Sequence, residues 1–148
     1  MKNTDLQKYI MSHVTRDGAC GYGLEETKNA NNAQDFINLL KTPKGVEHCM
    51  KFRFPEKSIL EEYRNDLEAN GVFVSGSHGV ENPRLVIAFG GHVKIMVDGF
   101  NVCEIYATND AIIEVTAKDN AFVSIELHHD AKLQKETHQH SKVKDFRK

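Results

Sequence analysis

The chain has 148 residues, enough for one domain or for a small domain with an appended module. Hydrophobic residues make up 40% of it, charged residues make up 27%, and the formal net charge is -2, all ordinary values for a globular protein. Basic residues gather only at the C-terminal end, which argues against binding to DNA or RNA. Apolar runs are short and the N-terminus lacks the apolar stretch of a signal peptide, so we expect a cytoplasmic protein with no membrane span.

Three cysteines, Cys20, Cys49 and Cys103, are spread along the chain. An odd number with no short Cys pair motif argues against both a disulfide framework and a thiolate zinc site. We expect reduced, buried thiols.

The first half of the chain is predicted to be helical, because apolar residues recur there at helical spacing. One helix is expected from a cap among residues 3–5 to a stop at Gly18. A second helix is expected to end near Thr42–Pro43, and a short helical turn is expected over 46–52.

The clearest helix is predicted over residues 58–70. Ser58 and Glu61 have the spacing of a capping box, in which each side chain bonds the other residue's backbone amide. After this helix the apolar period changes from helical to alternating, and the Gly- and Ser-rich stretch 75–79 is predicted to be a flexible joint.

From Gly91 the sequence repeats every ten residues without insertions. The third, fifth and seventh positions of the repeats are apolar, and Asn or Asp closes most repeats. The apolar residues are Val93, Cys103, Ile113, Val123 and Leu133, then Ile95, Ile105, Val115 and Ile125, then Val97, Ala107, Ala117 and Leu127. This alternation, with turn residues every ten positions, predicts strands of about six or seven residues joined by tight corners. Pro83–Gly90 is predicted to be an irregular first repeat.

Two topologies fit such corners. Consecutive strands could pair as hairpins in an antiparallel β-meander or sandwich, or each strand could turn into an opposite sheet so that every second repeat stacks in parallel. When repeats stack directly, the same position of each repeat comes into contact, which favours the same residue type there. The repeated Ala, Val and Asn or Asp fit this arrangement. We therefore predict an α+β chain with a helical module at 1–78 and a short two-sheet β-solenoid domain at 79–148.

The solenoid is expected to end near Leu133. The next inward positions carry Lys135 and Thr137, and a charged inward side chain marks the end of an apolar stack. The residues after His140, which are rich in Lys and Arg, are expected to form a short frayed C-terminal tail.

Repeats of the form Ala-x-Val-x-Val-x-Ala-x-Asp-Asn, best seen in Ala111–Asn120, resemble those of a group of uncharacterised bacterial and phage proteins with tandem Asp-Asn-Ala repeats. The match covers about the last third of the chain. Residues 18–24, Thr42–Gly45 and the helix after Pro55 are also similar to the N-terminal region of some gut-bacterial members. The resemblance implies a β-solenoid fold and brings no activity with it.

Histidines gather near the C-terminal end, at His128, His129, His138 and His140. Imidazole is a common ligand of Zn, Ni and Fe, and His-x-His on an extended strand places two rings on one side, within reach of one ion. In a two-sheet solenoid, however, His128 and His138 would lie on opposite faces. The His-x-His sequence also resembles the iron-binding apex of contractile phage tail spikes, from which the helical first half and the tail after His140 depart. A metal site and solvated histidines at a solenoid end are the two alternatives.

Catalytic chemistry has little support in the sequence. Cys49 follows His48, but adjacent side chains on a helix do not face each other and no third orienting residue is identifiable. Glu104, Glu114 and Glu126 sit at outward strand positions, where solubilising charge is the ordinary explanation. A small enzyme of unrecognised type is kept as an alternative.

Apolar residues also occupy outward positions of the predicted strands. Position two of the repeats carries Val102, Ile112 and Phe122, and position six carries Met96 and Tyr106. A sheet face with so many apolar side chains is expected to be covered, either by the chain's own helices or by another subunit or protein. Val102, Tyr106, Ile112 and Phe122 are therefore the candidate interaction surface.

The expected function is a non-catalytic binding or assembly module built on the solenoid, with no cofactor. Its partner is expected to be another protein or further copies of the chain, as a dimer or trimer. The rival expectation is a metal-binding tip or sensor, possibly phage-related in origin, that uses the histidine cluster.

Overall fold

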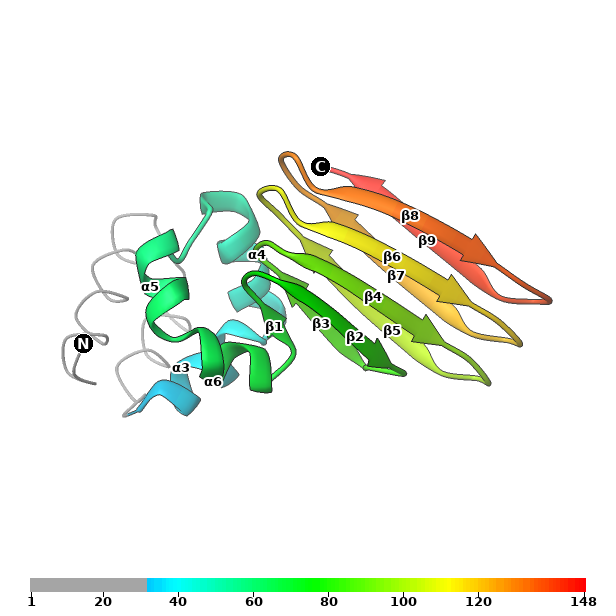
Figure 1. Cartoon of the computed structure of the whole chain (residues 1–148), viewed down its shortest axis with the longest axis horizontal. Coiled ribbons are helices and arrows are strands. Elements are labelled where there is room, and N and C mark those ends of the chain that lie inside the picture. Colours follow the sequence, from blue (N-terminus) through cyan, green and yellow to red (C-terminus); the bar gives the residue numbers. More distant parts are fainter. Residues whose placement is uncertain (1–31) are drawn as a thin grey trace. The chain divides into compact units, whose positions relative to one another are not determined.

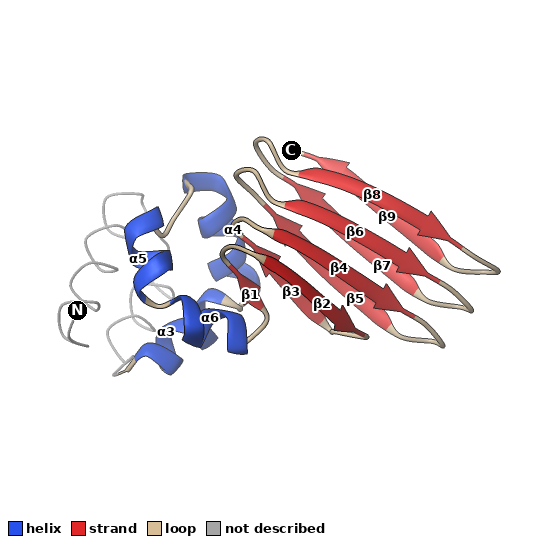
Figure 2. Cartoon of the chain, in the orientation of Figure 1, coloured by secondary structure: helices blue, strands red, loops and turns tan. Residues whose placement is uncertain are grey.

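The computed structural model describes residues 32–148. The chain divides into two compact units, Met1–Asp66 and Leu67–Lys148. Among the described residues, helices α3 to α5 lie in the first unit, the strands lie in the second, and α6 runs from one into the other (Figures 1 and 2). The helix predicted between residues 3 and 18 lies outside the described residues.

The first two described helices begin at polar caps. Helix α3 (Ala33–Leu40) starts after Asn32, whose side chain accepts a hydrogen bond from the Asp35 N–H at 2.9 Å. Helix α4 (Pro43–Phe52) starts after Thr42, whose hydroxyl accepts a bond from the Gly45 N–H at 3.1 Å. The predicted end of a helix before Thr42–Pro43 is confirmed, and the predicted turn over 46–52 belongs to a longer helix.

The helix predicted over 58–70 is two short helices, α5 (Lys57–Glu62) and α6 (Arg64–Ala69). They are separated at Tyr63, whose φ of -103° and ψ of 15° leave the helical region. The predicted capping box is wrong, because α5 starts one residue before Ser58, with Glu56 as a cap that makes no side-chain hydrogen bond.

The strands form two parallel sheets. Sheet A contains β1 (Val72–Phe73), β3 (Leu85–Ala88), β5 (Val102–Ala107), β7 (Phe122–Leu127) and β9 (Lys142–Arg147). Sheet B contains β2 (Ser77–Glu81), β4 (His92–Val97), β6 (Ile112–Ala117) and β8 (Lys132–Thr137). The chain alternates between the sheets, so each strand pairs in parallel with the strand two places along (Figure 1). The predicted α+β class with a two-sheet β-solenoid is confirmed, and the antiparallel alternative is excluded.

Like positions stack directly in the solenoid. His92 pairs with Ile112, and Val102 pairs with Phe122, so corresponding residues lie 20 positions apart in both sheets. The third, fifth and seventh positions of the ten-residue pattern face inward and fill the core. The most buried of them are Val93, Cys103, Ile113, Val123, Ile125, Val97, Ala107 and Ala117, all at 0% exposure. The sequence therefore predicted the inward face correctly.

Each corner between strands turns at a residue with positive φ. Gly99, Asn109, Asp119, His129 and Gln139 occupy this place, with φ values between 58° and 61°. Gly, Asn and Asp tolerate the left-handed region better than other residues, which explains why turn residues recur every ten positions. A corner side chain also bonds the backbone of the neighbouring coil: Gln139 Oε1 accepts a hydrogen bond from the Asp119 N–H at 2.6 Å.

The start of the solenoid is not the flexible joint that was predicted over 75–79, because Ser77–Glu81 is strand β2. The Glu68 carboxylate fixes the preceding backbone by accepting bonds from the N–H groups of Val74 and Ser75 at 3.1 and 3.3 Å. His78 Nε2 lies 3.1 Å from the same carboxylate, and its ring packs on Phe73 at 4.7 Å between ring centroids.

The end of the solenoid also differs from the prediction. The chain does not fray after His140 but forms strand β9, which pairs with β7 along its full length. Lys135 and Asp145 occupy inward positions of the last coil, yet both lie at its open end, where they reach water and form an ion pair of 2.5 Å. Charged inward residues therefore belong to a final coil and do not mark the end of the stack.

Candidate functional site

The four candidate metal ligands lie at opposite corners of the solenoid. His128 and His129 follow β7 and lead into β8, whereas His138 and His140 follow β8 and lead into β9. Each strand between corners has six residues, at about 3.3 Å per residue, so the two pairs are roughly 20 Å apart. The structure does not bring these four side chains together.

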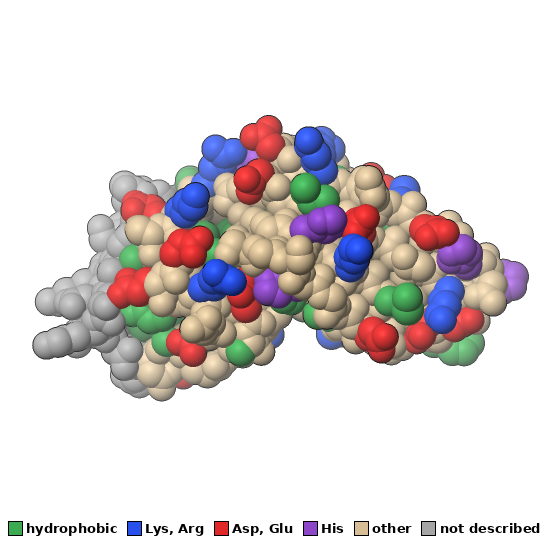
Figure 3. Space-filling model, in the orientation of Figure 1, with side chains coloured by type: hydrophobic (Ala, Val, Ile, Leu, Met, Phe, Trp, Pro, Cys, Tyr) green, Lys and Arg blue, Asp and Glu red, His purple; other side chains and the backbone are tan. Residues whose placement is uncertain are grey.

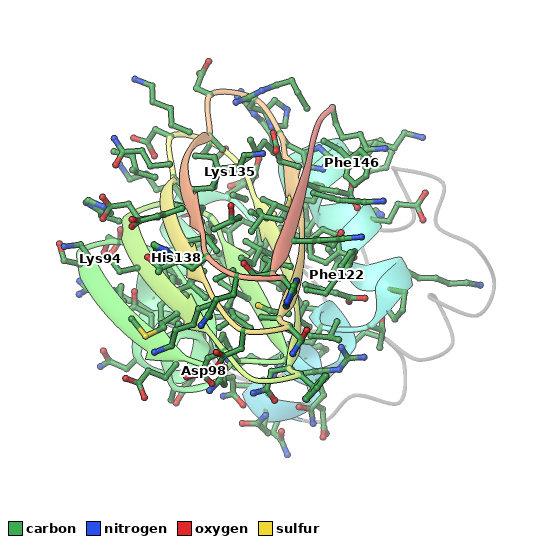
Figure 4. The ribbon with its side chains drawn as sticks, turned by 90° about the vertical axis from the view of Figure 1, so that its right-hand side faces the viewer. Lys94, Asp98, Phe122, Lys135, His138 and Phe146 are labelled. Carbon is green, nitrogen blue, oxygen red and sulfur yellow. The ribbon has the colours of Figure 1, made fainter. Side chains whose placement is uncertain are left out.

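The second histidine pair does not lie on an extended strand, as was assumed from the sequence. His138, Gln139 and His140 form the corner, with Gln139 at φ 58°, so the alternation of a strand does not apply. His138 Nε2 lies 3.2 Å from Glu136 Oε1. In Figure 4, His138 lies apart from Lys135, the residue at the open end of the solenoid.

The first histidine pair has partners of its own. His128 Nε2 is buried and makes no hydrogen bond; it lies 3.4 Å from Glu126 Oε1, a contact that becomes an ion pair only when the ring is protonated. His129 Nδ1 is 2.8 Å from Thr108 Oγ1. Within residues 32–148 no group of three or more His, Cys, Asp or Glu side chains is arranged to hold a metal ion.

The cysteine considered as a nucleophile is protonated in the folded protein. Cys49 is buried, and burial raises the pKa of its thiol to about 12. Burial also raises the pKa of the Cys103 thiol to about 12, with a smaller contribution from the Glu104 charge. Both are free, buried thiols, as the sequence predicted, and Cys20 lies outside the described residues.

The candidate interaction residues are divided between the two sheets. Val102, Tyr106 and Phe122 lie on the outer face of sheet A, whereas Ile112 lies on the outer face of sheet B, between His92 and Lys132. The four residues therefore do not form one strip. Residues at the same position of successive repeats fall in opposite sheets, because the chain changes sheet at every corner.

Sheet B has a mainly polar outer face. Figure 3 views the solenoid from this side and shows charged and histidine side chains with only single hydrophobic ones between them. His92 Nε2 lies 2.7 Å from Glu114 Oε2, and Lys94 Nζ lies 3.8 Å from the same oxygen. The apolar Met96 and Ile112 stand in different columns of this face, at positions six and two.

Sheet A carries four apolar residues on the outer face of its last three strands, two at position two and two at position six. We call the outward residues of its last three strands the β5–β7–β9 face; these are Val102, Glu104, Tyr106, Phe122, Ser124, Glu126, Lys142, Lys144 and Phe146. Val102 and Phe122 are direct neighbours across β5 and β7. Val102 is 43% exposed, Phe146 is 49% exposed, and Phe122 and Tyr106 are half-buried. Figure 4 shows Phe122 and Phe146 on the same side of the solenoid, opposite Lys94.

The exposed part of sheet A begins at β5. The outward residues Val72 on β1 and Ile87 on β3 are fully buried, although they stand in the same column as Tyr106. On β5 the phenol of Tyr106 has a raised pKa, first because of partial burial and then because of the charges of Glu104 and Glu126. Carboxylates therefore border the apolar residues at this end of the face.

Two exposed aromatic residues of the solenoid were missed from the sequence. Phe146 was assigned to a frayed tail, but the pairing of β9 with β7 places it beside Glu126 on the β5–β7–β9 face. Phe100, which is 85% exposed, occupies the corner before β5. Its position as the last residue of a repeat, where other repeats carry Asp, Asn or His, was the available signal.

Comparisons with protein-family models, with curated proteins and with solved structures found no match to this chain. No helix within residues 32–148 is long and apolar enough to cross a membrane.

Proposed function

We propose that this chain is a non-catalytic binding or assembly module whose contact surface is the β5–β7–β9 face. The observation that carries the proposal is the grouping of Val102, Tyr106, Phe122 and Phe146 on one sheet face. Aromatic residues are enriched in protein interfaces, and exposed apolar side chains gathered on one face favour contact with another protein. Parallel strands with a packed interior give this face a fixed shape, which favours binding without rearrangement.

The test is sedimentation of the purified chain from micromolar to submillimolar concentration. We expect a concentration-dependent oligomer, and we expect Phe122→Lys to shift it to the monomer, since the substitution places a charge on the middle strand of the face, beside Val102.

Ile112→Lys is the matched control, because Ile112 holds position two of a middle strand in the opposite sheet. It should leave the oligomer unchanged. A wild-type chain that stays monomeric at all concentrations would contradict assembly, and an oligomer that tolerates Phe122→Lys but loses its partner with Ile112→Lys would move the contact surface to sheet B.

A further inference from the structure

The β5–β7–β9 face carries opposite charges at its two ends. Glu104 on β5, Ser124 on β7 and Lys144 on β9 form one column across the three strands. Both charged side chains are exposed. Neighbouring strands are about 4.8 Å apart, so the acidic and basic ends of this column are separated by about 10 Å.

The aromatic residues are also divided between the two ends of the face. Tyr106 on β5 and Phe146 on β9 share a second column, at position six of their strands, and Phe122 lies on the middle strand. Each end of the face therefore has one aromatic residue, the β5 end has one acidic residue, Glu104, and the β9 end has two basic residues, Lys142 and Lys144.

Two copies can meet face to face about a two-fold axis in one of two simple orientations. If the axis runs along β7, strand β5 of one copy lies over β9 of the other, Glu104 meets Lys144 of the second copy, and Tyr106 meets Phe146 of the second copy. If the axis runs across the strands instead, Glu104 meets Glu104 and Lys144 meets Lys144. Like charges placed opposite each other are destabilising. The first orientation makes two Glu104–Lys144 pairs against one like-charge contact, that of Glu126 with its own copy, so it is favoured.

We infer that the occupant of the β5–β7–β9 face is a second copy of this chain, packed about a two-fold axis along β7, so that facing strands run parallel and their order is reversed. This inference rests on the proposed function and names its partner. Glu104 pairs with Lys144 twice in such a dimer, and Phe122 lies next to its own copy near the axis.

The size of the face sets the expected strength of the dimer. Three strands of six residues cover about 15 by 20 Å, or roughly 300 Å², which is less than the 800 Å² or so that each partner buries in a standard interface. We therefore expect a dimer that dissociates on dilution into the micromolar range.

Charge reversal tests the orientation. Glu104→Lys and Lys144→Glu should each weaken dimerisation about tenfold, since each places like charges opposite each other at two symmetric places. The two substitutions change the net charge in opposite directions, so a general charge effect would not weaken both. The double variant Glu104→Lys with Lys144→Glu should restore the dissociation constant to within about threefold of the wild type.

The control is Lys132→Glu, which makes the same charge change as Lys144→Glu on the last strand of the opposite sheet, and it should change dimerisation by less than about threefold. Glu126→Gln should strengthen dimerisation, because the two-fold axis places Glu126 beside its own copy. If Phe122→Lys abolishes the oligomer but the double reversal does not restore what the single reversals lose, the contact surface stands and the orientation with the axis along β7 is wrong. If the wild type stays monomeric, a second copy is not the occupant.

Discussion

At the scale of single residues, the alternation between core and surface decides which substitutions the solenoid tolerates. Val115 is 2% exposed in the core between the sheets, whereas the adjacent Glu114 points outward and pairs with His92 and Lys94. Neighbouring positions of one strand therefore have opposite environments. The same alternation places Phe122 on the surface and Val123 in the core.

Val115→Asp should lower the free energy of unfolding by about 3 kcal/mol or more, because it buries an unpaired carboxylate in the middle coil. Glu114→Ala, next to it, should cost less than about 1 kcal/mol, since it removes only a partly exposed ion pair. Urea unfolding followed by circular dichroism measures both. Equal losses from the two variants would contradict the assigned inward and outward faces.

At the scale of elements, the last coil of the solenoid is a polar cap. Its inward positions carry the Lys135–Asp145 ion pair, and Arg147 donates hydrogen bonds to the carbonyl oxygens of His129 and Ala131 at 2.9 and 2.5 Å. Terminal units of stacked proteins need a polar outer surface to remain soluble. Strand β9 therefore covers the apolar coil beneath it and presents charged groups to water.

Deletion of Ser141–Lys148 should lower the melting temperature on the order of 10 °C, because it removes β9 and exposes core residues of β7 such as Val123 and Ile125. A thermal scan of the full-length and truncated chains provides the measurement. A change of only a degree or two would support the frayed tail that the sequence had predicted.

The strands, their inward faces and the two-sheet topology could be predicted from the sequence, since a ten-residue apolar period leaves few other arrangements. The last coil could not be predicted, because the charged Lys135 side chain would destabilise a closed core but is tolerated at an open end, where it reaches water. The first strand of sheet B was missed for a different reason. Glu68 fixes the chain around Ser75 by accepting hydrogen bonds from the backbone, and the local pattern of residues does not predict these bonds.

The candidate surface was predicted only in part. Val102, Tyr106 and Phe122 were correctly placed outward, but Ile112 was grouped with them by its position in the repeat and lies in the other sheet. Phe146 was missed because its strand was not predicted. Grouping outward residues by every second repeat would have recovered the sheet A face.

At the scale of the whole molecule, the C-terminal end of the solenoid has the edge strands β8 and β9. Exposed edges invite pairing with other chains, and lysines on edge strands oppose it. The outward residues Lys132, Lys142 and Lys144 place positive charge along both edges. Association through the β5–β7–β9 face is therefore favoured over end-to-end stacking of solenoids.

The most direct measurement of this association is an isotope-filtered NOE experiment on a mixture of labelled and unlabelled chains, at a concentration where the oligomer is populated. It detects only contacts between different copies. We predict contacts from the Tyr106 ring of one copy to the Phe146 ring of the other, and from Phe122 to its own counterpart. Intermolecular contacts confined to Met96 and Ile112 on sheet B would contradict the assignment of the β5–β7–β9 face.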